Sequence, residues 1–203
     1  MERATIPGSR QPTVGLHERA MDNLSYIRAT MEQAGRFTAV PGTGAMWIGA
    51  VGLIAALVAA PLRGTLAWLA VWAGAALLAG AIGVTALRAK ARRTGVPLAT
   101  GPGRKFVLGF VPPLVLGAAL TGVALREEVV HLLPGLWLSL YGIGVMSAGS
   151  FSVRVVPFSG FVYLCLGLVA FLVPPAWSDA LLGLGFGVLH VAFGAVIRRR
   201  YGG

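Results

Sequence analysis

The sequence contains six stretches that run for about the thickness of a bilayer without a charged residue. An α-helix rises about 1.5 Å per residue, so roughly 20 apolar residues cross the hydrocarbon core of a membrane. The uncharged residues number 26 between Arg36 and Arg63, 24 between Arg63 and Arg88, 20 between Lys105 and Arg126, 22 between His131 and Arg154, 24 between Arg154 and Asp179, and 18 between Asp179 and Arg198. The pattern predicts an all-α fold, a polytopic bundle of six transmembrane helices.

The chain divides into two expected parts. Residues 1–43 are polar and should form an N-terminal cytoplasmic arm with a short amphipathic helix, and residues 44–203 should form the six-helix transmembrane domain. The connection over residues 88–105 contains three glycines and two prolines, which predicts an irregular loop. The spans are expected at about 44–62, 66–87, 106–125, 132–152, 156–173 and 180–197.

Charge is sparse and unevenly distributed along the chain. Only 12% of the residues are charged, against about 25% in an average soluble domain. Of 17 Lys and Arg residues, 15 fall on one side of the predicted membrane, and the other side has only Arg63 and Arg126. The positive-inside rule then places both termini in the cytoplasm, so the net charge of +10 reflects topology and does not indicate nucleic-acid binding. The predominance of arginine over lysine is typical of a GC-rich bacterial genome, which predicts a bacterial inner-membrane location.

Residues 16–36 have the periodicity of an amphipathic helix that is too polar to span a membrane. Two interpretations remain open, a helix lying at the cytoplasmic interface and a helix that docks a partner or forms a dimer. The interfacial interpretation is favoured because three heptad steps are too few to define a coiled coil. The basic connection 88–105 is similarly a candidate for binding anionic lipids. Apolar residues of the helix recur at spacings of 4, 3, 4 and 3, at Ala20, Leu24, Ile27, Met31 and Ala34.

His190 is the one ionisable residue predicted inside a span, since no Asp, Glu, Lys or Arg falls in any of them. That absence argues against a proton relay or an ion site, because such sites need intramembrane charge. In an α-helix, His190 would share a face with Gly183, Gly187 and Gly194, and small residues allow close helix packing. We therefore expect a histidine that is hydrogen-bonded at a helix interface. A haem or metal ligand is the alternative.

Hydroxyl groups and one arginine complete the set of candidate residues. Tyr141, Ser147 and Tyr163 fall in the fourth and fifth spans and are candidates to line a small polar cavity. Arg154 is the only charge between these spans, and is either anchored to lipid phosphate or bound to an anion. The fourth span has a face of mostly small residues that predicts close packing against another helix, formed by Gly135, Ser139, Gly142, Met146 and Gly149. The five tryptophans mostly fall near predicted span ends, which is typical of interfacial belts.

Two segments resemble those of uncharacterised bacterial six-span integral membrane proteins. They are the block from Met21 to Gly42, MDNLSYIRATMEQAGRFTAVPG, and the ending from His190 to Gly203, HVAFGAVIRRRYGG. The resemblance extends over nearly the whole chain and implies the same architecture. That group has no assigned activity, so the resemblance implies no site.

The sequence contains no HExxH, GxSxG, P-loop or CxxC motif and no paired carboxylates inside the spans. We therefore predict no catalytic residue, no metal and no cofactor. The leading functional hypothesis is a non-enzymatic membrane protein that packs against or regulates a partner, either another protein or a second copy of itself. The alternative is a small permease for a neutral or hydrophobic solute, which would use the intramembrane hydroxyls.

Overall fold

The computed structural model describes residues 18–27, 37–95, 98–99 and 101–202. The chain forms two compact units, Met1–Gly35 and Arg36–Gly203. In the first unit, residues 18–27 form a helix on which Leu24 and Ile27 are exposed. The rest of the amphipathic helix expected over residues 16–36 lies outside the described residues.

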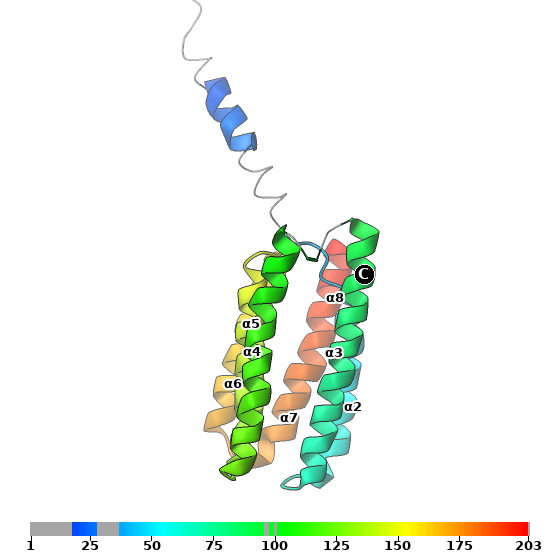
Figure 1. The fold of residues 1–203 in the computed structure, drawn as a ribbon, viewed down its shortest axis with the longest axis vertical. Helices are drawn as coiled ribbons and strands as arrows, with labels where there is room; N and C mark the ends of the chain where they lie inside the picture. Colours follow the sequence, from blue (N-terminus) through cyan, green and yellow to red (C-terminus); the bar gives the residue numbers. More distant parts are fainter. Residues whose placement is uncertain (1–17, 28–36, 96–97, 100, 203) are drawn as a thin grey trace, which may run out of the picture. The chain divides into compact units, whose positions relative to one another are not determined.

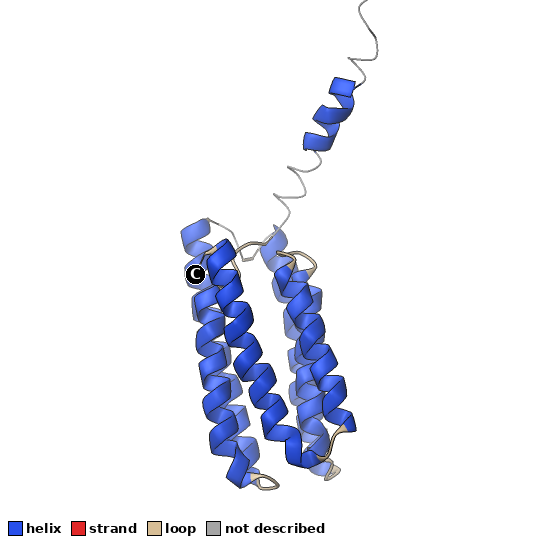
Figure 2. Ribbon diagram, turned by 180° about the vertical axis from the view of Figure 1, so that it is seen from behind, coloured by secondary structure: helices blue, strands red, loops and turns tan. Residues whose placement is uncertain are grey.

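The described part of the second unit contains six helical segments long and apolar enough to cross a membrane (Figure 1). It contains no β-strand, only an isolated bridge between Phe37 and Ser152 (Figure 2). The predicted all-α, six-span fold is therefore confirmed. The segments are α2 (Gly42–Ala59) with η1 (Ala60–Leu62); α3 (Leu66–Thr94); α4 (Gly101–Arg126); η2 (Val130–Leu132) with α5 (Leu133–Gly149); α6 (Val155–Leu172); and a last segment of η3 (Pro175–Trp177), α7 (Ser178–Leu182), η4 (Gly183–Leu189) and α8 (His190–Tyr201).

The connection between α3 and α4 is shorter than the sequence predicted. The expected irregular loop over 88–105 is wrong for most of its length, because α3 continues to Thr94 and α4 begins at Gly101. Alanine, arginine and lysine favour helix, and positive charge is stabilised at a helix C-terminus. Gly95 then ends α3 in the left-handed conformation, with φ +67°.

The six segments form two groups of three helices. The first group is α2, α3 and α8, in which α2 packs against both of the others and against η4. The second is α4, α5 and α6, in which α5 is central. The groups meet where α5 and α6 approach the last segment, and α4 packs mainly on α5 (Figures 1 and 2). The first and last helices of the domain, α2 and α8, thus belong to the same group.

Glycines bring α5 and α6 into backbone contact, as the small-residue face of the fourth span predicted. A Cβ atom at Gly142 would lie 2.5 Å from the backbone nitrogen of Leu164 and 2.7 Å from the carbonyl oxygen of Gly160. One at Gly160 would lie 2.5 Å from the backbone nitrogen of Met146. Real Cβ atoms do not come this close, so this interface requires glycine on both helices.

Asp179 is buried at one end of the domain, although the sequence analysis placed it outside the spans. Its carboxylate lies 2.7 Å from the guanidinium of Arg63 and accepts a hydrogen bond of 2.7 Å from the Trp68 indole N–H. The Trp72 indole donates to the same oxygen at 3.4 Å. Trp68 and Trp72 are thus interior groups that fix α3 to α7, and the expected interfacial belt is wrong for these two.

The segment before α2 is fixed by both groups of helices at the other end of the domain. The N–H of Phe37 donates to the carbonyl of Phe151 at 2.6 Å, and the Ser152 hydroxyl donates to the carbonyl of Phe37 at 2.6 Å. The Lys90 ammonium of α3 donates to the carbonyl of Val40 at 2.9 Å. These bonds hold Val40 in a fixed position beside the interior of the domain.

Candidate functional site

His190 contacts two tyrosine hydroxyls from the opposite group of helices. Its Nε2 atom lies 2.7 Å from the hydroxyl oxygen of Tyr141 on α5, and its Nδ1 atom lies 2.7 Å from that of Tyr163 on α6. His190 is 5% exposed and Tyr163 is 3% exposed. The imidazole therefore joins α8 to α5 and α6 through hydrogen bonds away from water.

The π-helical segment η4 directly precedes His190. Such segments have hydrogen bonds from i to i+5 and are frequent at functional sites. Within η4, Gly183 and Gly187 face α2, where added Cβ atoms would lie 2.9 Å from Ala56 Cβ and 2.6 Å from Leu53 Cδ2. The expectation that His190 shares this face is wrong, because its ring is directed at α5 and α6. A π-helical segment has more residues per turn than an α-helix, which changes the register between these positions.

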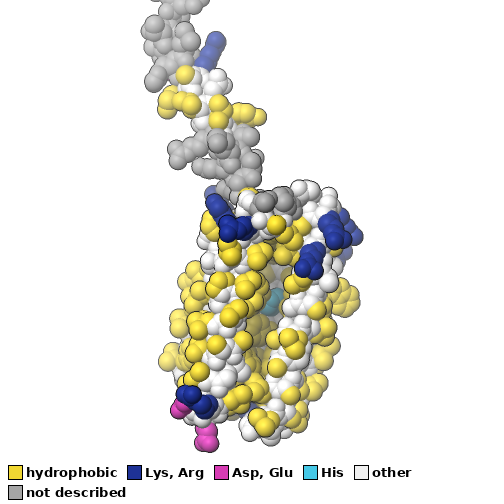
Figure 3. Space-filling view, viewed as in Figure 1, with side chains coloured by type: hydrophobic (Ala, Val, Ile, Leu, Met, Phe, Trp, Pro, Cys, Tyr) yellow, Lys and Arg dark blue, Asp and Glu magenta, His cyan; other side chains and the backbone are white. Residues whose placement is uncertain are grey.

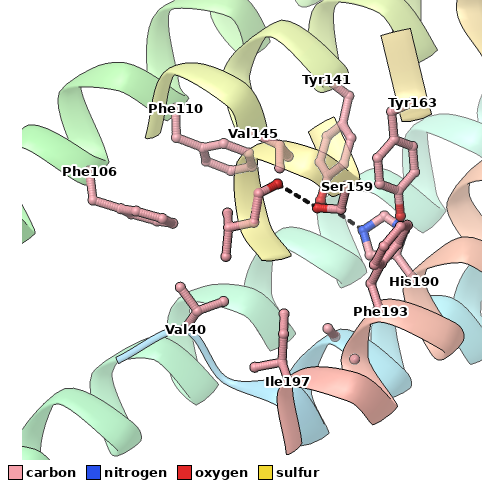
Figure 4. A pocket seen from close by; sticks show the side chains of 13 residues that line it. Val40, Phe106, Phe110, Tyr141, Val145, Ser159, Tyr163, His190, Phe193 and Ile197 are labelled. Carbon is pink, nitrogen blue, oxygen red and sulfur yellow. Dashed lines mark hydrogen bonds between the residues drawn. The ribbon is translucent and has the colours of Figure 1, made fainter. Parts of the chain in front are cut away.

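A cavity of about 110 Å³ lies beside the imidazole, between the two groups of helices (Figure 4). Tyr141, Tyr163 and His190 form its polar wall, and none of the described residues that line it is charged. Because an isolated buried charge is costly, a neutral imidazole fits this surrounding best. The other lining residues are mostly apolar: Val40, Ala45, Phe106, Phe110, Val145, Val156, Ser159, Phe193, Gly194 and Ile197.

Aromatic contacts hold the Tyr141 ring in place. Its centroid lies 5.0 Å from the Tyr163 ring, 5.4 Å from the Phe186 ring and 5.7 Å from the Phe110 ring, with interplanar angles of 77°, 81° and 81°. These are edge-to-face arrangements, each worth about 0.5–1.5 kcal/mol beyond the area buried. The hydroxyl of Tyr141 is therefore positioned before any molecule enters the cavity.

On the face shown in Figure 3, a histidine side chain is visible at the bottom of a groove between α3 and α4. The walls of this groove are hydrophobic side chains of two helices that are apolar enough to span a membrane. If α3 and α4 cross a membrane, the walls of this groove face its hydrocarbon region.

The structure separates the candidates named from the sequence. Tyr141, Tyr163, His190 and Gly194 line one cavity. Gly194 also packs on α2, where a Cβ atom would lie 2.8 Å from the carbonyl oxygen of Gly42. Ser147 instead faces Gly109 of α4, and Arg154 is exposed at the start of α6, so neither lines the cavity.

Sequence reasoning missed the aromatic lining of the cavity, Phe106, Phe110 and Phe193. Phenylalanine is common throughout membrane helices, so no local signal marked these three. The ion pair between Asp179 and Arg63 could have been predicted from the sequence. Each residue is the lone charge in a connection between two predicted spans, and both connections lie on the same side of the predicted membrane. Hydropathy alone does not show such a pairing.

Among the described residues, no group of three His, Cys, Asp or Glu side chains is placed to hold a metal ion. The chain matches no known family model, no curated protein and no solved structure. The geometry of the cavity and its polar wall is therefore the basis for a functional proposal.

Proposed function

We propose that this membrane protein binds a small, uncharged and largely apolar solute in the cavity beside His190, as a permease does. The observation that supports the proposal is the cavity itself, an apolar space with three fixed polar side chains on one wall. Binding sites for small molecules commonly combine apolar walls with a few convergent polar groups.

The volume and charge of the cavity limit what it can hold. A cavity of about 150 Å³ is known to bind one benzene ring, so about 110 Å³ fits a group of somewhat smaller size. A charged solute would lack a counter-ion among the lining residues. A neutral solute therefore fits the site, and a longer one would extend from the cavity into the groove.

Filling the cavity should remove the bound solute without unfolding the protein. Ala45 lines the cavity, so in Ala45→Leu the larger side chain occupies part of the space. Ala73 on α3 is exposed, so Ala73→Leu adds the same volume where it meets lipid. After gentle purification, mass spectrometry should find a small molecule bound to the wild type and Ala73→Leu, and several-fold less on Ala45→Leu. Equal recovery from all three proteins, or none from the wild type, would contradict the proposal.

A second role, packing against a protein partner or another copy of the chain, is favoured by one feature of α3. No described atom beyond the adjacent residues and the nearby backbone of α3 itself lies within 4 Å of a Cβ built at Gly74 or Gly80, whereas glycines of α5 and α6 contact neighbouring helices. Small residues on a lipid-exposed helix allow a partner helix to approach closely. A stoichiometric protein that co-elutes with the wild type and is lost from Gly80→Leu would support this role. Its retention by Gly80→Leu would count against it.

We further infer that both termini lie in the cytoplasm of a bacterial cell, with the α3–α4 connection on the same side. The distribution of basic residues supports this orientation, because 15 of 17 would then face the cytoplasm. Alkaline phosphatase fused after residue 129 should be active, and the same reporter fused after residue 95 should be inactive. Activity at residue 95 and none at residue 129 would reverse the orientation.

A further inference from the structure

The polar wall of the cavity contains one more hydrogen than its own contacts use. A neutral imidazole has one N–H donor and one acceptor nitrogen, and each tyrosine has one O–H donor. The three groups Tyr141, His190 and Tyr163 thus bring three hydrogens to two contacts of 2.7 Å. Each contact uses one hydrogen, and the ring nitrogen that carries the imidazole N–H cannot accept one from the tyrosine beside it. The remaining hydrogen therefore belongs to a tyrosine hydroxyl in either tautomer.

Apart from these two contacts, the described residues form no hydrogen bond with either tyrosine hydroxyl, although the imidazole also interacts with the backbone carbonyls of Gly185 and Phe186. Ser159 is the remaining hydroxyl on the lining, and it donates to the carbonyl of Val156 at 2.7 Å. Both tyrosines line the cavity, and the Tyr163 side chain is buried, with only 3% of its surface exposed. A molecule that offers an acceptor to this donor would therefore be favoured over one that does not.

We propose that the cavity recognises the carbonyl group of a lipid-soluble molecule, which accepts the hydrogen bond of the spare tyrosine hydroxyl. A carbonyl oxygen is an acceptor with no hydrogen of its own, which complements a wall with one donor in excess. This inference rests on the proposed function and names the chemical class of its solute.

The groove between α3 and α4 gives the route by which such a molecule enters. A histidine side chain is visible from this face, between two hydrophobic walls (Figure 3). A molecule dissolved in the bilayer can therefore reach the polar wall sideways, with its apolar remainder lying in the groove.

Two probes of similar size test the carbonyl preference. Acetophenone and isopropylbenzene have the same number of non-hydrogen atoms, and only acetophenone has an acceptor. Binding is measured by equilibrium dialysis of the full-length protein in lipid nanodiscs, and empty nanodiscs give the correction for partition into lipid. The acetophenone-to-isopropylbenzene affinity ratio of the wild type is then compared with that of Tyr141→Phe/Tyr163→Phe/His190→Leu, which has an apolar wall of similar shape.

The triple variant replaces all three side chains of the polar wall together, so no tyrosine or histidine is left without its side-chain partner. Its affinity ratio is expected to fall roughly tenfold relative to the wild type, the effect of one buried hydrogen bond. Tyr141→Phe alone should keep the ratio, since the remaining histidine and tyrosine bring two hydrogens to one contact. Binding of both probes with an unchanged ratio in the triple variant would refute the carbonyl preference and leave the proposed function intact. If Ala45→Leu binds both probes as well as the wild type does, the cavity is not the binding site and the proposed function fails.

Discussion

Replacing Gly142 with leucine is expected to destabilise the transmembrane domain by at least about 3 kcal/mol, the upper end of the usual overpacking range. A Cβ atom at this position would lie 2.5 Å from the backbone nitrogen of Leu164, and a backbone atom cannot rotate away as a side chain can. Helix α6 must therefore move as a whole. Thermal unfolding of the purified protein, followed by size-exclusion chromatography, measures the loss.

Gly122 of α4 provides the matched control for that substitution. Beyond the adjacent residues and the nearby backbone of α4 itself, no described atom lies within 4 Å of the position that a Cβ would take there, and the residue is exposed. Gly122→Leu should therefore change stability by no more than about 0.5 kcal/mol. Equal unfolding temperatures for Gly142→Leu and Gly122→Leu would contradict the observed contact between α5 and α6.

Asp179→Ala is expected to cost about 3 kcal/mol, the lower end of the range for breaking a buried ion pair. The loss combines the ion pair with Arg63 and the acceptor of the Trp68 indole N–H. The lower end applies because the Arg63 side chain is 38% exposed and regains water when its partner is removed. Chemical denaturation of the purified variant measures the change.

An exposed ion pair of similar length serves as the control. Arg126 and Glu127 lie 2.8 Å apart, but their side chains are 79% and 54% exposed. Such pairs contribute about 0–1 kcal/mol, so Glu127→Ala should have a small effect. In a double-mutant cycle, Arg63→Ala should cost less in an Asp179→Ala background than in the wild type. Additive effects would show that Arg63 and Asp179 are not coupled.

The number and type of the spans were predictable because both follow from the length of charge-free sequence. The α5–α6 contact was predictable for a related reason, since Gly135, Gly142 and Gly149 recur on one helical face. The extension of α3 was missed because charged residues were taken as the end of a helix. Arginine and lysine end a membrane crossing without ending the helix that makes it.

The site was only partly predictable because its geometry depends on contacts distant in sequence. His190, Tyr141 and Tyr163 were each identified as polar residues within spans. Their pairing joins positions 49 and 27 residues apart, and no periodicity predicts that. The π-helical segment before His190 also changed the face on which the ring lies. The cavity depends on how the two groups of helices meet, which the order of the spans does not show.

The most direct test of a binding site beside His190 is to locate a molecule in it. Crystals of the full-length protein grown in lipid and soaked with 4-bromoacetophenone would reveal bromine by its anomalous scattering. We expect a bromine peak in the cavity or in the adjoining α3–α4 groove, with the carbonyl oxygen within hydrogen-bond distance of the Tyr141 or Tyr163 hydroxyl. Bromine peaks confined to other lipid-facing surfaces, with the cavity empty, would contradict the proposed function.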